Sequence, residues 1–351
     1  VFPHTAKNLE TYRYRMLEAA KANAAKNGYQ GAQYPWESAD DGTEQCPDWT
    51  IEPDGTCYRC YVAVYEHHVT AAVAYGIYNY VRITHDTEFL LHKGAEILIE
   101  TARFWKSRLQ YIKENDRYEI HRVTGPDEWH EPVDNNVYTN YLARWNLRYV
   151  TALTEMLSRE YPQEYTALVE KLGLTEEEIA DWDAVAAKVY LPRKEGTQLL
   201  EQFEGYFDLK EAVIEKYDSN DWPIRPEILN TTKKCETQII KQADVVMLLH
   251  LMGQEFDEET TKLNYSYYEK RTLHGSSLSP SIYSIMGLKV GDDSKAYRYL
   301  RRAALIDLVN LQGNTREGIH AANAGGVWQV VVFGFAGVSL DEEGMLCICP
   351  H

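Results

Sequence analysis

The sequence predicts an all-α protein, and three observations support that fold class. Apolar residues recur at helical spacing through most of the chain, strand-like alternation is scarce, and no Gly/Ser-rich linker divides the sequence. Many antiparallel helix pairs in a single core of this size are typical of a helical barrel or toroid. A solenoid is the competing architecture, but the sequence has no fixed repeat period.

Periodicity and capping residues place the helices of the first half. Apolar residues at i and i+4 predict a helix over residues 65–80. Asp86 has the side chain of an N-cap and is expected to begin the next helix. The stretch Arg117–Val123 is the best candidate for a strand. Another helix is expected over Asn135–Val150, with apolar residues along one face.

The second half adds four helical signals. Thr175 and Glu178 have the spacing of a capping box, which predicts the start of a short helix. Leucine and alanine residues along 300–311 predict a further helix. The segment 273–280, LHGSSLSP, is expected to enter a helix, and the small residues of 317–329 predict a helix that permits close backbone approach.

Composition narrows the classes of function. The formal net charge of −17 argues against a nucleic-acid surface and against adhesion to an anionic membrane. No leader peptide is visible, and the longest apolar run, 327–338, is too short to cross a bilayer. We therefore expect a cytoplasmic protein. Its closely spaced cysteine pairs, Cys57/Cys60 and Cys347/Cys349, lack the usual zinc spacing, and we predict free thiols and no metal site.

The most informative segment is VTGPDEWHEPVDNNVYTNYLARWNL, residues 123–147. Gly-Pro cannot continue a helix, so the segment begins as a loop, and the acidic residues of this loop lie within eight positions. Neighbouring carboxylates and an aromatic wall from Trp129 would favour the neutral, proton-donating form of an acid such as Glu128. The alternative interpretation is an acidic, solvated loop that caps a helix.

Three other motifs contain polar residues in unexpected places. In IKQADVV, Lys241 and Gln242 interrupt an apolar run, so they are either partnered structural groups or residues that face a cavity. In LHGSSLSP, hydroxyls at the start of a helix can bind an anion or simply cap the helix. In EGIHAANAGGVWQ, His320 and Asn323 are available as donors, although tight helix packing also explains the small residues.

Together with YPWESA (residues 34–39), these motifs resemble one family and follow its order along the chain. The family is that of the inverting disaccharide phosphorylases grouped with maltose, kojibiose, nigerose and trehalose phosphorylases, glycoside hydrolase family 65. The likeness runs from about residue 7 to the end of the chain.

The resemblance implies a catalytic (α/α)6 barrel that occupies residues 1–351. The family's flanking N-terminal β-sandwich and C-terminal β domain have no counterpart in this sequence. The first barrel helices of the family, which include a sugar-binding Trp-Asp pair, would lie before residue 1. The barrel is therefore expected to be incomplete at its N-terminal end.

The resemblance also implies a mechanism. Glu128 would protonate the glycosidic oxygen of an α-linked glucosyl disaccharide while inorganic phosphate attacks the anomeric carbon from the opposite face. The products would be β-glucose 1-phosphate and a free acceptor sugar. Because phosphate is already an anionic nucleophile, a second catalytic carboxylate is unnecessary and would repel it, whereas an inverting hydrolase needs that carboxylate to activate water.

By the same resemblance, the remaining site residues bind substrate or phosphate. The expected substrate-binding residues are Lys241, Gln242, Trp129, His130 and Glu131. His130 and Glu131 would either touch the acceptor sugar or shape the surroundings of the acid. The expected phosphate-binding residues are Ser276, Ser277, His320 and Gly325. No cofactor is implied beyond phosphate as co-substrate, and a homodimer is common among the relatives.

Two rival functions remain open. An inverting hydrolase on the same barrel, trehalase-like or glucoamylase-like, would need a second carboxylate opposite Glu128, and Glu317 is the candidate. A non-catalytic carbohydrate-binding fragment is the other rival. The disaccharide itself cannot be identified from the sequence. Kojibiose, nigerose, maltose, trehalose and glucosylglycerol are all candidate substrates. The residues of the HGSSLSP motif slightly favour the first two.

Overall fold

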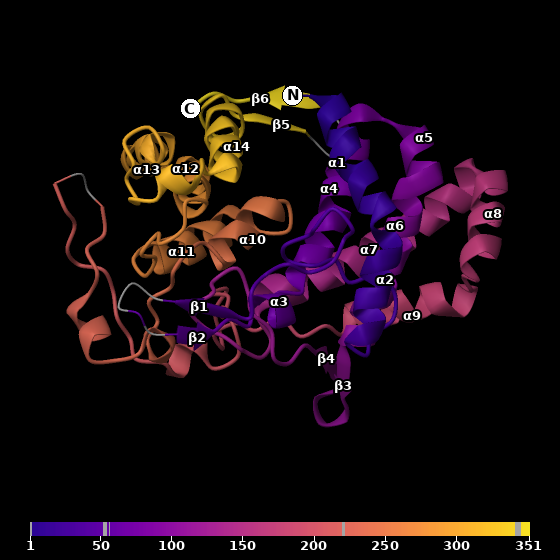
Figure 1. Ribbon diagram of the computed structural model, residues 1–351, viewed down its shortest axis with the longest axis horizontal. Coiled ribbons are helices and arrows are strands. Elements are labelled where there is room, and N and C mark those ends of the chain that lie inside the picture. The colour runs from indigo at the N-terminus through magenta and orange to yellow at the C-terminus, as the bar shows by residue number, and fades with distance from the viewer. Residues whose placement is uncertain (1, 52–54, 56, 220–221, 341–344) are drawn as a thin grey trace. The chain divides into compact units, whose positions relative to one another are not determined.

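The computed structural model describes residues 2–51, 55, 57–219, 222–340 and 345–351, and helices predominate among them (Figure 1). The all-α prediction is confirmed at this level. The chain divides into two compact units. One unit comprises Val1–Gly125 and Pro132–Leu191, and the other comprises Pro126–Glu131 and Pro192–His351.

Nine α-helices, one π-helical turn and two small antiparallel hairpins make up the described part of the first unit. They are α1 (Pro3–Arg15), α2 (Leu17–Lys26), β1 (Trp49–Ile51), β2 (Cys57–Arg59), α3 (Val62–Tyr65), α4 (His68–Thr84), α5 (Thr87–Phe89), the π-helix η1 (Leu90–Gly94), α6 (Ala95–Arg108), β3 (Gln110–Ile112), β4 (Arg117–Glu119), α7 (Val137–Glu160), α8 (Pro162–Leu172) and α9 (Glu176–Ala187), with a 3-10 turn, η2 (Lys113–Asn115), between β3 and β4.

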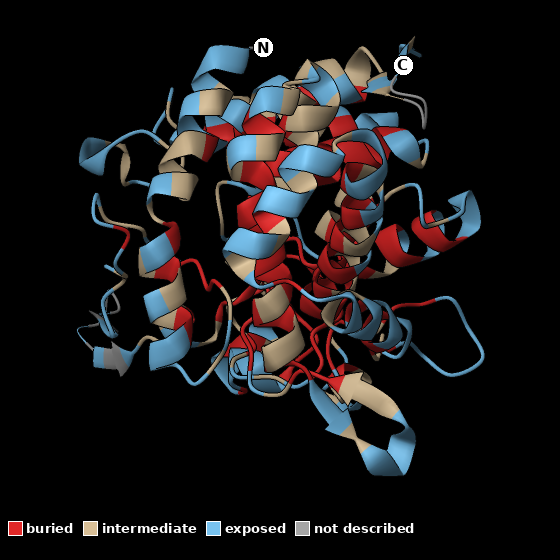
Figure 2. Ribbon diagram, turned by 90° about the vertical axis from the view of Figure 1, so that its right-hand side faces the viewer, coloured by how far each residue is buried: buried red, intermediate tan, exposed pale blue. Residues whose placement is uncertain are grey.

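The core of the first unit forms around α7, which packs against α4, α6 and α9. Figure 2 shows helices with both buried and exposed positions, whereas residues 95–102 of α6 and 137–143 of α7 are buried without interruption. The helices predicted over 65–80 and 135–150 are confirmed as α4 and α7. Both predicted caps are confirmed as well, because Asp86 accepts a hydrogen bond from the amide of Phe89 and Thr175 from that of Glu178.

The strand predicted over Arg117–Val123 is shorter in the structure. Only Arg117–Glu119 pairs, with β3 as an antiparallel neighbour. Beyond Glu119 the amide of Ile120 donates to the side chain of Asn135, and Val123 pairs with Val133 in an isolated bridge. The strand pattern ends early because the loop ahead of α7, not a longer strand, supplies the hydrogen-bond partners.

The second unit is built mainly from its C-terminal half. Its described elements are the 3-10 turns η3 (Tyr206–Asp208), η4 (Glu227–Asn230) and η5 (Lys234–Glu236), the helices α10 (Val245–Leu251), α11 (Glu258–Glu269), α12 (Ser279–Lys289) and α13 (Asp293–Leu305), the 3-10 turn η6 (Thr315–Glu317), α14 (Ala321–Gln329), the π-helix η7 (Val330–Phe335) and the antiparallel pair β5 (Val338–Leu340) and β6 (Leu346–Ile348).

Helix α12 is the centre of the second unit. Residues 279–288 of this helix are all buried, and it packs against α10, α11, α13, α14 and η7. The predicted helix entry within 273–280 and the predicted helix of small residues are confirmed as the start of α12 and as α14.

The helix predicted over 300–311 ends sooner than expected. Helix α13 stops at Leu305, and Leu308, which was expected on its apolar face, is 79% exposed. The chain turns back because Asn310 and Gly313 both adopt the left-handed conformation and the amide of Leu311 donates to the carbonyl of Ile306. Helical spacing alone does not reveal such a reversal.

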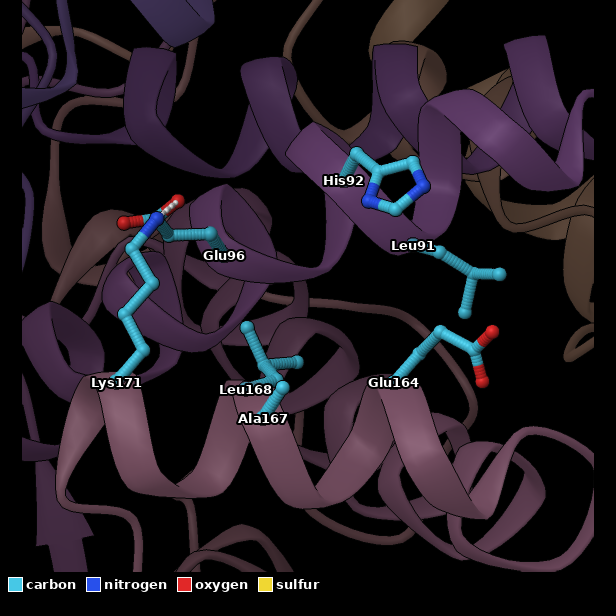
Figure 3. Close-up of a pocket in the computed structure, with 7 residues that line it drawn as sticks. All are labelled: Leu91, His92, Glu96, Glu164, Ala167, Leu168 and Lys171. Atoms are coloured by element: carbon cyan, nitrogen blue, oxygen red, sulfur yellow. Dashed lines mark hydrogen bonds and ion pairs between the residues drawn. The ribbon is translucent and has the colours of Figure 1, made fainter.

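A pocket of about 200 Å³ opens in the first unit (Figure 3). It is lined by Leu91, His92, Glu96, Glu164, Ala167, Leu168 and Lys171. The Lys171 ammonium forms an ion pair of 2.6 Å with Glu96 at one end. None of the residues that the motifs implicate in function lines this pocket. Among the described residues, no helix is both long enough and apolar enough to span a membrane.

Candidate active site

The six-residue loop Pro126–Glu131, called the acid loop below, belongs to the second unit together with Lys241, Ser276 and His320. Glu128 is about a quarter exposed, and its carboxylate lies 2.9 Å from the Nζ atom of Lys241. The side-chain amide of Gln242 donates to the other carboxylate oxygen at 3.3 Å and also to the carbonyl of Pro126. The structure thus brings together the predicted acid and both residues of the Lys-Gln pair.

Asp127 holds the acid loop in place through hydrogen bonds. Its buried carboxylate accepts hydrogen bonds from the Lys241 amide at 2.8 Å, the Gln202 side chain at 3.0 Å and the Trp129 amide at 3.4 Å. The Nδ1 atom of His130 also lies 2.6 Å from this carboxylate. The sequence places Asp127 among the carboxylates expected to crowd Glu128. In the structure its charge is taken up by these donors instead, and the group beside Glu128 is a cation.

His130 is 2% exposed, with both ring nitrogens engaged by the protein. The Nε2 atom lies 2.8 Å from the carbonyl of Thr237. Burial disfavours the charged ring, but the carboxylate of Asp127 and the Thr237 carbonyl outweigh that effect, and the pKa of His130 is raised above its usual value.

The other two predicted substrate residues of the loop are partly buried. Trp129 packs against an apolar cluster formed by Ile214, Leu229 and Ile239, and the ammonium of Lys234 lies 5.4 Å from the centre of its ring. Glu131, at the end of the loop, is intermediate in exposure. Trp129 therefore fastens the loop to the second unit through an apolar contact.

Two backbone segments, one around Ile240 and one around Leu273, run side by side. The amide of Ile240 donates to the carbonyl of Arg271, and the amide of Leu273 donates to the carbonyl of Ile240, in a parallel bridge. The pairing continues to the amide of Gly275, which donates to the carbonyl of Lys241 at 2.8 Å. A Cβ atom on Gly275 would lie 3.3 Å from the Lys241 side chain, so glycine permits this approach. The serine motif therefore begins directly beside Lys241.

The serines of that motif precede α12. Ser276 and Ser277 are partly exposed, and the hydroxyl of Ser276 accepts from the amide of Leu278 at 3.3 Å. His274, separated from them by Gly275, is buried in the left-handed conformation, and its Nδ1 atom lies 2.9 Å from the Ser279 hydroxyl. Burial, aided by the nearby Arg302 guanidinium, lowers the pKa of His274 to about 3, so this ring is neutral. His274 bends the chain and fastens the serine segment to α12.

His320 lies at the N-terminus of α14 and is oriented by a carboxylate. Asp307, in the turns after α13, approaches the Nδ1 atom of His320 at 2.6 Å and accepts from its backbone amide at 2.8 Å. These two contacts lower the pKa of Asp307. The arrangement holds the ring by one nitrogen and leaves the other available to a ligand, as in many carboxylate–histidine pairs.

Helix packing sets the position of His320 relative to the serine segment. The side chain of Asn323 in α14 donates to the carbonyl of Ala303 in α13, and Gly326 lies against Ser281 in α12. Gly325, whose amide was predicted to face phosphate, is exposed, with open space around its Cα atom. Glu317, the carboxylate that a hydrolase would require, has a side chain that is 68% exposed.

Four residues of this arrangement were not identified from the sequence as site residues: Asp127, Gln202, His274 and Asp307. Asp127 and His274 lie inside motifs, but functional roles were expected of neighbouring residues in those motifs. Gln202 and Asp307 have no local signal, because they reach Asp127 and His320 only through the tertiary fold. All six cysteines are free, and no cluster of His, Cys, Asp or Glu side chains suited to a metal ion occurs among the described residues.

Known proteins resemble this chain in sequence and in fold. Residues 1–329 match the glycosyl hydrolase family 65 central catalytic domain. A kojibiose phosphorylase of Thermoanaerobacter brockii is 57% identical over 348 residues, which cover 99% of this chain and 45% of the relative. Another, of Caldanaerobacter subterraneus subsp. tengcongensis, is 55% identical over 350 residues, with coverage of 100% and 45%.

A solved structure is similar as well. It is that of a human-microbiome protein with a provisional assignment as a kojibiose phosphorylase, with a TM-score of 0.86 and 31% identity. The match covers 99% of this chain and 44% of that one. The chain thus spans about half the length of the proteins it matches.

Proposed function

Because the chain belongs to the family of the glycosyl hydrolase family 65 central catalytic domain, we propose that it forms the catalytic part of an inverting disaccharide phosphorylase. Its helices would contribute to the (α/α)6 barrel that the motifs imply. The reaction would transfer the glucosyl unit of an α-linked disaccharide to inorganic phosphate, releasing β-glucose 1-phosphate and a free sugar. Assembly as a homodimer and a cytoplasmic location are part of the same proposal.

The observation that carries this proposal is the contact of Glu128 with Lys241 and Gln242. A carboxyl that is partly exposed, on an otherwise anchored loop, can deliver a proton to a glycosidic oxygen. Lys241 and Gln242 offer an ammonium and an amide, which suit the hydroxyls of a glucosyl unit. The Lys241 ammonium pairs with Glu128, and a bound glucosyl unit would compete for that ammonium.

Donors rather than a second carboxylate support phosphorolysis over hydrolysis. The serine segment begins beside Lys241, and its two hydroxyls stand just ahead of α12. His320, held by Asp307, adds an imidazole donor. Such groups stabilise an anionic nucleophile, whereas a hydrolase requires a carboxylate base to activate water.

Kojibiose is the first substrate to test. The relatives with 57% and 55% identity are kojibiose phosphorylases, and the residues of the serine motif slightly favour kojibiose and nigerose. Nigerose, maltose, trehalose and glucosylglycerol complete the panel. The experiment uses the intact full-length protein, with and without phosphate, and measures glucose 1-phosphate and its anomeric form.

The catalytic role of Glu128 is tested by the Glu128→Gln variant. Gln fills the same space but cannot donate the acid proton, so kcat should fall by about 100-fold to 10,000-fold. The matched control is Glu227→Gln, which changes a carboxylate of the same unit that is 82% exposed and should retain full activity. Equal release of glucose without phosphate would establish a hydrolase instead. Sugar binding with no turnover would establish a binding protein.

A further inference from the structure

Besides Glu128, the acid loop contains two side chains that pair with each other, Asp127 and His130. We propose that His130 acts as a positioning residue that is protonated at neutral pH, pairs with Asp127 and so holds Glu128 at the glycosidic oxygen. The family resemblance implied either a substrate contact or a role in shaping the surroundings of the acid for His130, and the contacts of its ring favour the second. It rests on the proposed function only for the role of Glu128.

The protonation state of His130 follows from its two neighbours. Its Nδ1 atom lies 2.6 Å from a carboxylate oxygen of Asp127, and its Nε2 atom lies 2.8 Å from the carbonyl of Thr237. Neither neighbour can donate a hydrogen bond at these positions, because an ionised carboxylate and a carbonyl only accept. A neutral imidazole carries one N–H and would leave a lone pair facing an acceptor. The imidazolium, with two N–H groups, satisfies both contacts.

The contacts of Asp127 other than His130 fit a carboxylate. It accepts from the amides of Lys241 and Trp129 and from the side chain of Gln202. These three N–H donors face its two oxygens, and a protonated oxygen, itself a donor, would compete with them. Asp127 and His130 therefore form a buried ion pair that joins the acid loop to the segment that carries Lys241.

The surroundings keep this pair dry. His130 is 2% exposed and lies against the rings of Phe203 and Tyr206, with centroid distances of 5.2 and 6.2 Å. The buried carboxylate of Asp244 also acts on the His130 ring, and its Oδ2 atom accepts from the amide of Asp127 at 3.3 Å. Both carboxylates favour the charged ring. Removing one member of such a pair leaves an uncompensated buried charge, which the loop can relieve only by moving.

Movement of the loop would reduce catalysis more than binding. Glu128 is one residue from Asp127 and two from His130, so a shift of the pair carries the acid with it. A displacement of about 1 Å at a catalytic group costs about 100-fold in rate. The Lys241 and Gln242 side chains assigned to the glucosyl unit and the donors assigned to phosphate lie outside the acid loop and would move less than Glu128. The pair therefore affects kcat and leaves KM nearly unaltered.

The test compares variants of the intact protein. His130→Gln and Asp127→Asn should each lower kcat by about 100-fold, with KM for disaccharide and phosphate changed by no more than about 2-fold. The double variant should be little worse than either single one, because each removes the same ion pair. The control is His250→Gln, which replaces a histidine of α10 that burial keeps neutral, with its pKa lowered to about 4. It should leave kcat unchanged.

A readout independent of turnover comes from heteronuclear NMR of the ring nitrogens in the wild-type protein. His130 should show the imidazolium signature at neutral pH and lose it only above the usual titration range, with a parallel fall of kcat on the alkaline side. A neutral ring at neutral pH would overturn the proposal even if the variants fail to fold. A raised KM for the sugar with an unchanged kcat would overturn it as well, since His130 would then be a substrate ligand. Absence of phosphorolysis in the wild-type protein would instead defeat the proposed function, which the NMR result does not require.

Discussion

Three histidines of the second unit have different environments because their partners differ. His130 faces two acceptors and is charged, whereas His274 faces a serine hydroxyl and is neutral. His320 has one nitrogen bound to Asp307 and the other available to a ligand. Residue type alone indicates none of these states. The hydrogen-bond partner of each ring decides between structure, positioning and ligand binding.

Asp307 is expected to support phosphate binding through His320. The Asp307→Asn variant removes a charge-assisted hydrogen bond worth about 1.5–3 kcal/mol, so KM for phosphate should rise by about 10- to 100-fold. KM for the disaccharide should stay the same. The control is Asp293→Asn, an exposed carboxylate at the other end of α13. Initial rates at varied phosphate and varied disaccharide separate the two constants, and equal changes in both would refute the assignment.

Contact between α12 and α14 sets the positions of the serine segment and His320 relative to each other. Gly326 of α14 lies so close to α12 that an added Cβ atom would fall 2.5 Å from the Ser281 hydroxyl and 3.0 Å from its Cβ atom. Neighbouring Gly325 faces open space. Two adjacent glycines of one helix therefore offer a matched pair of substitutions.

The Gly326→Ala variant should destabilise the protein by about 1–3 kcal/mol, because α14 must move away from α12. Gly325→Ala, at an open helical position, should instead be neutral or stabilising by about 0.5–1 kcal/mol. Urea unfolding of both variants measures the difference. Equal stability of the two would show that the helices do not pack as closely as described.

Stability of the molecule as a whole depends on pH through Glu10. This residue of α1 is buried against Gly76 of α4, and one of its carboxylate oxygens has no hydrogen-bond partner among the described residues. Burial, only partly opposed by Arg13, raises the pKa of Glu10 from 4.5 to about 7. The folded state therefore prefers the neutral carboxyl, so its contribution is complete below pH 4.5 and is lost as pH rises to about 7.

Replacement of Glu10 by Gln should remove this dependence. Above pH 7 the Glu10→Gln variant should be more stable than the wild type by up to about 3 kcal/mol, and near pH 4.5 the two should be similar. The control is Glu18→Gln on α2, where the side chain is 81% exposed. Urea midpoints measured between pH 4.5 and 8 provide the comparison. A constant difference across that range would argue against titration of Glu10.

Local chemistry made much of the fold predictable. Helices over residues 65–80 and 135–150 follow from periodicity, and the caps at Asp86 and Thr175 follow from side chains that bond their own helix. The predicted strand and the predicted helix over 300–311 were too long, because Asn135 and Asn310 end them through contacts and conformations that spacing does not encode.

The sequence by itself determined the helical class, the loop with its acidic residues and the motifs that identify the family. Only the tertiary structure decided that Glu128 meets Lys241, 113 positions along the chain, and that Asp127 meets His130 and Gln202 rather than crowding the acid. The physical reason is range. Capping and periodicity act within a few residues, whereas the charge and orientation of a buried group depend on partners that only chain folding brings within hydrogen-bond distance.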